Sequence, residues 1–531
     1  MSKAAMHPMP DRWWIPAGAI LAGLLAFGLY VPSLSSGFVY DARAQIEGDT
    51  YIHTPGHVWN ILTLRVLSED VLDSGRPVHL LSLWGDAMVW GKSPRGYHLT
   101  SNLLHALATA LLFLLLCKLG TVERDVSPRL AWCAALMGSL WFSVHPVHVE
   151  AVAEVSYRED LLATFFLLAG LYAAAMFSAL RGTPRMVVAV LCVAFLLGAA
   201  GSKETGFSGP LLLACYAVLY HRQEGLRPWM PLLAAAFLVV GVFGAARVFL
   251  RPEVSEIFTV QPSYPGGSLA AAMQIQPRIW TFLWGQLAWP GGLSGDYMPS
   301  HIADISPTTG WMVLAIVVAL QIALSIKSRL ACLGSALFWL GLAPVSNFLP
   351  LFRPMADRFL YLPATGAACL LAAAILLAGH RRMILIPLTG LWALTVPLLA
   401  WQTCQRQRVF ANELNLWVDT ATKSPDSPTA LINRGYAFYE VGEYGRALED
   451  SERALAMTHG QQPEPWATLA LIFETTGEPR RAEEALQNAV RLDPRYRTPM
   501  ESFPPAMMDA SQAAAFERIA RRLRIASETD Q

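Results

Sequence analysis

Long apolar segments, separated by short polar ones, constrain the fold of this chain more than any other feature. They recur from Trp14 to Trp401, and a helix crosses a bilayer with about 20 apolar residues. Apolar residues make up 54% of the chain and charged residues only 15%, which excludes an ordinary soluble protein of 531 residues. Because a spanning segment must satisfy its own backbone hydrogen bonds, the pattern predicts an all-α, polytopic membrane helix bundle.

We expect about eleven spans, several of them shorter than about 20 residues and therefore suited to the interior of a bundle. The apolar segment Ile279–Trp289 is shorter still and is followed by Pro290-Gly291-Gly292, so we interpret it as a re-entrant or interfacial helix. The predicted spans are 14–34, 97–117, 130–145, 161–180, 186–201, 207–220, 230–249, 311–326, 330–349, 358–379 and 383–401.

Clusters of Lys and Arg fall in loops that are separated by an even number of predicted spans. By the positive-inside rule these loops are cytoplasmic, and so is the N-terminus with Lys3 and Arg12. The polar loop that contains Asp41 and the region after Trp401 then lie on the opposite, non-cytoplasmic face. No A-x-A site lies between the end of the first apolar segment and Asp41, so we expect the first span to be retained rather than cleaved as a signal peptide.

After Trp401 charges occur every few residues, and we divide the chain into a membrane domain, 1–404, and a second domain, 405–531. Two segments of the second domain match at an offset of about 35 residues, close to the helix–turn–helix tetratricopeptide period. We expect a short α-solenoid, preceded by a half repeat at 412–424 and closed by a helix at 508–525. Such repeats either bind a peptide or protein on a concave surface or pack as a cap on the membrane domain.

Polar residues on the predicted non-cytoplasmic face are the candidates for function. Asp41 is the most informative, because a carboxylate at the mouth of a span is costly and its default interpretation is functional. Near the other spans we single out Arg76, His98, His145, His148, Glu150, Arg158, Asp160, Lys203, Glu204, Arg358 and Tyr361.

Structural roles compete with function at several of these positions. His98 shares a helical face with Asn102 and His105, where hydrogen bonds between packed helices are the alternative. Lys203 with Glu204, and Arg158 with Asp160, can form internal ion pairs. His145 and His148 have no specific metal-ligand spacing, so we assign no metal ligands and leave a divalent metal open. The seven cysteines show no C-x-x-C spacing.

These residue types together suit one chemistry. A carboxylate on the outer face can act as general base for a hydroxyl nucleophile. Arg and Lys can hold a phosphate leaving group, and an apolar bundle can hold a lipid tail. The pattern therefore predicts glycosyl transfer from a polyprenyl-phosphate sugar. The expected acceptor is a protein, and the alternative acceptor is an envelope glycan or lipid. A function of a different class is also open: a non-catalytic scaffold that uses its repeats for protein assembly.

An ordered series of motifs carries a family resemblance over nearly the whole chain. It resembles the transmembrane and tetratricopeptide-repeat O-mannosyltransferases of the GT-C glycosyltransferase superfamily. The motifs are Phe38-Val39-Tyr40-Asp41, Arg76-Pro77, Tyr97-His98, His145-Pro146-Val147-His148 with Glu150, Arg158 with Asp160, Ser202-Lys203-Glu204-Thr205, Pro344-Val345-Ser346-Asn347 and Arg358-Phe359-Leu360-Tyr361.

The resemblance implies transfer of a sugar, typically mannose, from a lipid phosphate to Ser or Thr hydroxyls. Asp41 matches the catalytic acid of the first loop, and the chain has Ala42 where the family usually has a second acidic residue. We expect Arg158, Lys203 and Arg358 to contact the donor phosphate, and the repeats to bind the acceptor protein.

The location of the protein and one class of partner follow from what the sequence lacks. The absence of Asn-x-Ser/Thr acceptors and of a C-terminal retention signal favours a bacterial inner membrane with periplasmic repeats over an endoplasmic reticulum membrane with luminal repeats. Lys+Arg and Asp+Glu balance at 40 each, so no nucleic-acid partner is expected.

Overall fold

The computed structural model describes residues 13–223, 225–250, 263–379, 381–497 and 510–529; Lys3 and Arg12 lie outside them. These residues form helices and contain no strand, which confirms the all-α prediction. The chain divides into two compact units. We call Met1–Ser35, Thr54–Leu293 and Ile302–Gln407 the membrane unit, and Ser36–His53, Ser294–His301 and Arg408–Gln531 the repeat unit.

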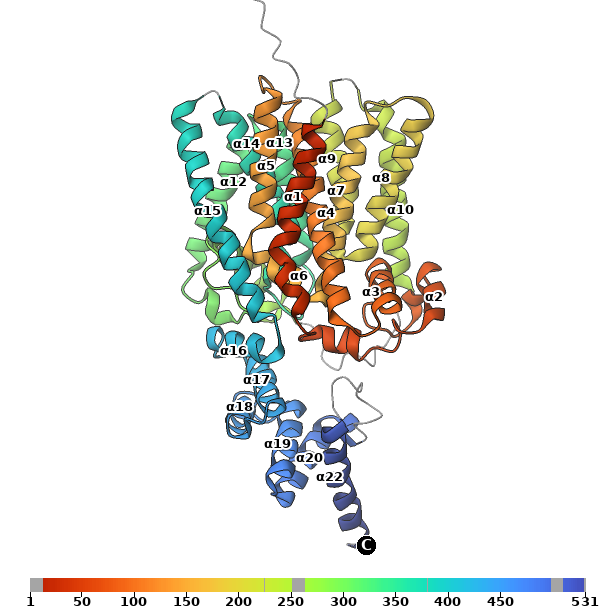
Figure 1. Ribbon diagram of the computed structural model, residues 1–531, viewed down its shortest axis with the longest axis vertical. Helices are drawn as coiled ribbons and strands as arrows, with labels where there is room; N and C mark the ends of the chain where they lie inside the picture. Colours follow the sequence, from red (N-terminus) through yellow and green to blue (C-terminus); the bar gives the residue numbers. More distant parts are fainter. Residues whose placement is uncertain (1–12, 224, 251–262, 380, 498–509, 530–531) are drawn as a thin grey trace, which may run out of the picture. The chain divides into compact units, whose positions relative to one another are not determined.

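Helices occupy all eleven segments that the sequence predicts as spans, and the long ones lie side by side in the membrane unit (Figure 1). They are α1 (Trp14–Tyr30), α4 (Pro94–Gly120), α5 (Pro128–Ser143), α7 (Arg158–Phe177), α8 (Gly182–Ser202), α9 (Gly209–His221), α10 (Met230–Phe249), α12 (Pro307–Ser325), α13 (Arg329–Leu342), α14 (Tyr361–Ala378) and α15 (Arg382–Val409).

Fewer helices meet the requirements of a span than the sequence suggests. Among the described residues, eight helices are long and apolar enough to cross a membrane, or nine if a bent pair counts as one span. The bent pair is α5 with the helical segment Pro146–Ala153, which includes α6 (Val149–Ala153), and the chain turns by 52° between them. The remaining difference arises because α9 has only 13 residues and α13 only 14.

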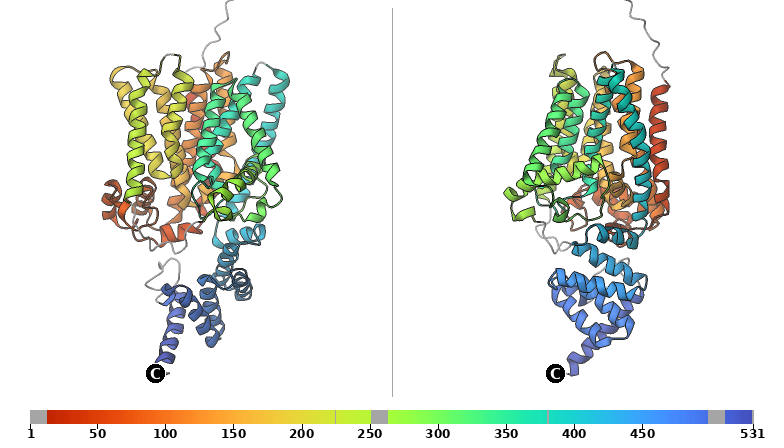
Figure 2. Two further views of the ribbon diagram at one scale, coloured as in Figure 1. Left: turned by 180° about the vertical axis from the view of Figure 1, so that it is seen from behind. Right: turned by 90° about the vertical axis from the view of Figure 1, so that its left-hand side faces the viewer.

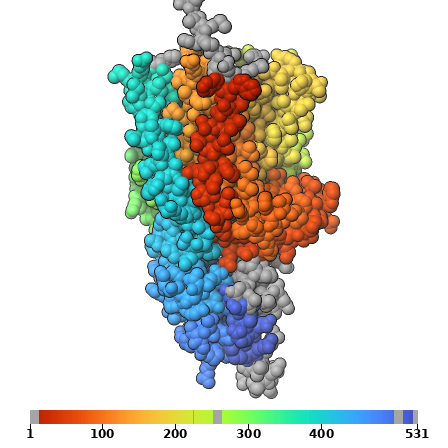
Figure 3. Space-filling view, in the orientation of Figure 1, coloured from red at the N-terminus to blue at the C-terminus, as the bar shows by residue number. Residues whose placement is uncertain are grey.

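Small residues let helices of the membrane unit approach closely, as expected where lipid offers no hydrophobic driving force. A Cβ atom on Gly334 of α13 would lie 2.9 Å from the carbonyl oxygen of Gly366 in α14. This contact fixes α14, whose first turn follows Arg358. Helix α1 lies along the visible surface in Figure 3. Its residues Ile20 and Leu24 are exposed, as lipid-facing residues would be.

The segment predicted as re-entrant or interfacial forms the second half of α11 (Leu269–Ala288). This helix contains Pro277 and is not among the helices apolar enough to span. In the right-hand view of Figure 2 it runs across the long helices rather than along them. Its placement in a membrane stays a prediction. Two further short helices, α2 (Val58–Leu62) and α3 (Pro77–Trp90), belong to the loop after α1.

The repeat unit contains two helix pairs at the positions of the matching segments: α17 (Pro428–Glu440) with α18 (Tyr444–Met457), and α19 (Pro463–Thr476) with α20 (Pro479–Leu492). Gly442 and Gly477 end the first helix of each pair with φ of +82°, a conformation that favours glycine. Helix α16 (Glu413–Lys423) precedes the pairs as the half repeat.

The expected closing helix is α22 (Ala510–Thr529), and residues 508–509 of that prediction lie outside the described ones. Phe516 and Ile519 of α22 are buried in the core that the two helix pairs form. The unit also includes two segments that the sequence prediction placed in the domain 1–404, namely Ser36–His53 and Ser294–His301. The polar residues of the second segment, such as Asp296, bond to Ser424 and Ser427.

Candidate functional site

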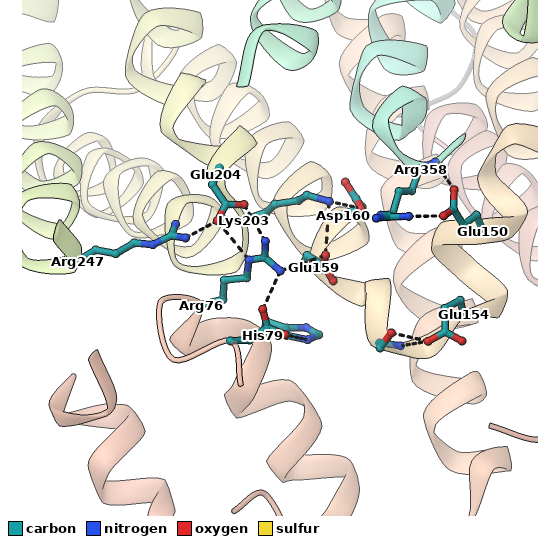
Figure 4. Close-up of polar contacts among 12 residues, drawn as sticks. Arg76, His79, Glu150, Glu154, Glu159, Asp160, Lys203, Glu204, Arg247 and Arg358 are labelled. Carbon is teal, nitrogen blue, oxygen red and sulfur yellow. Dashed lines mark hydrogen bonds and ion pairs between the residues drawn. The ribbon is translucent and has the colours of Figure 1, made fainter. Parts of the chain in front are cut away.

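Arg76 is the centre of a charged network in the membrane unit (Figure 4). Its guanidinium lies 2.8 Å from Asp73, 3.4 Å from Glu159 and 3.1 Å from Glu204. Burial by itself would lower the pKa of Arg76, but Glu204, Asp73 and Glu159 outweigh it and raise that pKa well above its ordinary value. Arg76 is therefore cationic at any physiological pH.

Two further cations enter the same network from other helices. Lys203, which follows α8, pairs with Asp160 and lies 3.5 Å from Glu159. Arg247, near the end of α10, pairs with Glu204. Burial would raise the pKa of Glu204, but Arg76 and Arg247 hold it below its ordinary value. Three cations thus face four carboxylates, which are Asp73, Glu159, Asp160 and Glu204.

The backbone around Lys203 explains how the network is held. Helix α8 ends at Ser202, Lys203 is extended, and a 3-10 turn follows from Glu204 to Ser208. A Cβ atom on Gly206 would overlap the backbone of Ala199, so the turn can close against α8 only because glycine is present. The sharp turn places Lys203 and Glu204 on different partners, with Lys203 4% exposed and the Glu204 side chain 38% exposed.

Arg358 and Glu150 form a further ion pair, separate from those of Arg76, at the N-terminal end of α14. The backbone N–H of Arg358 also donates to the other oxygen of the carboxylate, at 2.9 Å. The guanidinium carbon lies 3.9 Å from the centre of the Tyr157 ring. A cation held by a carboxylate on one side and a ring face on another is strongly oriented.

Arg158 is placed differently from the other predicted phosphate contacts. It is fully buried, 2.7 Å from Asp86 of α3. The guanidinium also donates to Ser82, Ser101 and the backbone oxygen of Tyr97. These contacts join α3, α4 and α7. The predicted partner Asp160 is instead bound to Lys203.

The predicted histidines gather in the bundle interior rather than in the charged network. His105 shares hydrogen bonds with the Tyr361 hydroxyl at 2.8 Å and the Ser143 carbonyl at 3.1 Å. His98 is also fully buried, and the ring of His148 lies between those of His105 and His145, at 5.8 and 6.0 Å. Within the described residues, no three His, Cys, Asp or Glu side chains gather as a metal site.

Asp41 belongs to the repeat unit, whereas Arg76, Lys203 and Arg358 belong to the membrane unit. Asp41 is half-buried and opens a helical turn that continues as a short π-helix, Arg43–Glu47. Ala42, at the position where the resembling family usually has an acid, is 0% exposed. A carboxylate at that position would be buried in this loop conformation.

Sequence reasoning missed Arg247, Asp73 and Asp86. For Arg247 a signal was present, because it is the one charged residue in the apolar segment 230–249, and a charge within a span is by default functional. Asp73 and Asp86 lie in the polar loop among other acids, and nothing local distinguishes them.

Comparison with known proteins finds sequence relatives of this chain. The chain is 26% identical over 434 residues to a protein O-mannosyl-transferase of Caenorhabditis elegans, F38B6.6, covering 78% of this chain and 59% of that protein. It is 24% identical over 514 residues to protein O-mannosyl-transferase TMTC3 of Homo sapiens, covering 88% and 54%. It is 37% identical over 212 residues to Tmtc2 of Drosophila melanogaster, covering 37% and 21%.

The chain therefore spans little more than half the length of the relatives that it matches over most of its own length. No model of a known protein family matches it, and no solved structure does. The relatives share one name, and the matches to the C. elegans and human proteins extend over most of this chain. These relatives support the family of transmembrane and tetratricopeptide-repeat protein O-mannosyl-transferases, which the motifs of this chain resemble.

Proposed function

We propose that this multi-pass membrane protein transfers a sugar, typically mannose, from a polyprenyl phosphate to Ser or Thr hydroxyls of proteins on the non-cytoplasmic face. The observation that carries the proposal is the convergence of Arg76, Lys203 and Arg247 from three separate parts of the bundle. Converging cations beside apolar helices suit a lipid-linked phosphate. The names of the relatives, protein O-mannosyl-transferases, support a protein acceptor and mannose as the sugar.

The donor phosphate would exchange places with carboxylates of the network. Glu204 forms ion pairs with two arginines at once, and its side chain is 38% exposed. Its carboxylate can therefore move away from both arginines without opening the core. Arg76 and Arg247 would then bind phosphate oxygens in place of carboxylate oxygens. Arg358, beside its exchangeable partner Glu150, is the further phosphate contact that we propose. Arg158 is bound to Asp86 inside the bundle, and we propose that it orients α3 and α4.

Asp41 is the proposed general base. The acceptor hydroxyl oxygen attacks the anomeric carbon of the sugar, and its proton passes to the Asp41 carboxylate. The bond between that carbon and the phosphate oxygen breaks, and polyprenyl phosphate leaves with the electron pair. The repeats bind the acceptor protein. We place the protein in a bacterial inner membrane with periplasmic repeats, the alternative being an endoplasmic reticulum membrane with luminal repeats.

The test is transfer of radiolabelled mannose from polyprenyl-phosphate-mannose to envelope extract, with purified wild type beside Asp41→Asn. Label on protein bands with the wild type alone is the expected result. Label on a glycan or lipid would leave the donor chemistry standing and overturn the protein acceptor. Folded wild-type protein that transfers no polyprenyl-phosphate sugar at all would overturn the enzyme and favour the scaffold. The same assay with EDTA tests for a divalent metal.

A further inference from the structure

The segment that carries Asp41 packs on the first helix of the repeats, within the repeat unit. The backbone N–H of Gly37 donates to the carbonyl oxygen of Ala411 at 3.0 Å, just before α16 begins. Val39 and Ala42, on either side of the pair Tyr40-Asp41, are 1% and 0% exposed. The segment is therefore packed in place rather than extended into solvent.

Tyr40, the residue before Asp41, has an unusual backbone. Its φ is +49°, in the left-handed region that costs a non-glycine residue conformational energy. Its backbone N–H donates to Oε1 of Glu413 at 2.7 Å. Its ring meets the Trp417 ring edge-on, with 5.1 Å between the centres. The indole N–H of Trp417 donates to Oε2 of Glu413, so one carboxylate joins α16 to the Asp41 segment at its strained position.

A second anchor follows Asp41. Arg43 donates two hydrogen bonds to the Glu440 carboxylate of α17, at 2.9 and 3.2 Å. Both side chains are about three-quarters buried, with 20% and 26% exposed. Such bidentate pairs fix orientation as well as distance. Asp41 thus lies between one anchor on α16 and another on α17.

We propose that Glu413 is a positioning residue for Asp41, so that the first repeat helices are part of the catalytic apparatus and not only an acceptor-binding module. The inference rests on the proposed function, because it takes Asp41 as the base. Glu413 does not touch the reacting atoms. It holds the Tyr40 N–H in a conformation that the chain would otherwise leave, and thereby sets the direction from which the Asp41 carboxylate approaches the hydroxyl.

The experiment compares Glu413→Ala and Glu413→Gln with wild type, using a Ser/Thr peptide and polyprenyl-phosphate-mannose. Glu413→Ala removes both hydrogen bonds. Glu413→Gln retains an oxygen for the Tyr40 N–H and should recover part of the loss. The matched control is Glu464→Ala, which removes the corresponding first-turn carboxylate of α19 without touching the Asp41 segment.

We expect Glu413→Ala to lower kcat on the order of 10- to 100-fold, because a displacement of about 1 Å at a catalytic group can cost that much. KM for peptide and donor should stay unchanged, and the melting temperature should match that of Glu464→Ala. An unchanged kcat would overturn the proposal. So would a raised peptide KM with wild-type kcat, which would make Glu413 an acceptor contact.

Asp41→Asn in the same assay distinguishes a failure of the positioning role from a failure of the proposed function. If Asp41→Asn is inactive and Glu413→Ala is fully active, the positioning role is wrong and the proposed function stands. If Asp41→Asn transfers mannose at the wild-type rate, the proposed base is wrong, and the positioning role is wrong with it.

Discussion

The backbone N–H of Tyr40 lies 2.7 Å from Oε1 of Glu413, although the two residues are 373 positions apart in the sequence. Every α-helix of the membrane unit except α1 lies between them along the chain. The contact gives the loop after the first helix a fixed support on the repeats. Since Tyr40 has a left-handed backbone conformation, the hydrogen bond also offsets part of the conformational energy that this backbone costs.

The Arg43–Glu440 pair should stabilise the Asp41 segment measurably. In a double-mutant cycle of Arg43→Ala and Glu440→Ala, we expect a coupling of about 1 kcal/mol, because the pair is bidentate and largely buried. Hydrogen exchange of peptides that cover residues 36–53 is the measurement. The two single variants should expose this segment about equally, and the double variant little more. Additive effects would show that the side chains act independently.

Arg158 should be needed for folding rather than for donor binding. Arg158→Ala leaves Asp86 buried without its partner, which costs about 3–5 kcal/mol. We expect little monodisperse protein by size-exclusion chromatography in detergent. The double variant Arg158→Met/Asp86→Leu removes both charges and should recover folded protein with wild-type donor KM. A recovered protein with strongly raised donor KM would make Arg158 a phosphate contact after all.

Arg247 should contribute to donor affinity. Arg247→Ala removes one of the two arginines at Glu204, and we expect donor KM to rise about 10-fold, the value of one charge-assisted hydrogen bond. Arg227→Ala, just before the opposite end of the same helix, is the control and should leave KM unchanged. Equal effects of the two variants would argue against a phosphate site at this end of α10.

His79 should make the membrane unit sensitive to mild acid. It is fully buried, and burial lowers its pKa below 6.5 despite Glu159 and Asp73; Arg76 and Arg158 lower it further. The unfolded chain then binds the proton first as pH falls, so the contribution of His79 to stability is complete above about pH 6.5 and is lost below it.

The melting temperature at pH 7.5, 6.5 and 5.5 measures this effect. We expect it to fall with pH in the wild type and to fall less in His79→Leu. His459→Asn, at an exposed histidine of the repeats, should follow the wild type. A slope in His79→Leu equal to that of the wild type would assign the acid sensitivity to other groups.

The candidate site shows where sequence reasoning stopped. The motifs predict charged residues on one face of the membrane domain, namely Arg76, Lys203, Glu204, Glu150 and Arg358. They do not predict which of these side chains form ion pairs with each other. Arg158 and Asp160 are two positions apart and belong to one motif, yet the helix turns their side chains to different partners, Asp86 and Lys203. Pairing depends on helix rotation and on the turn at Gly206, which are settled by packing.

The sequence by itself determined the all-α architecture, the eleven apolar helices and the paired repeat helices, because apolar runs and small-residue spacing act locally along the chain. The structure decided which of those helices are long enough to span. The α5 segment is bent before Pro146, and α9 and α13 are short. Only the tertiary structure brought Arg247 to Glu204 and seated the Asp41 segment on Glu413. Such contacts join distant parts of the chain, and no local propensity encodes them.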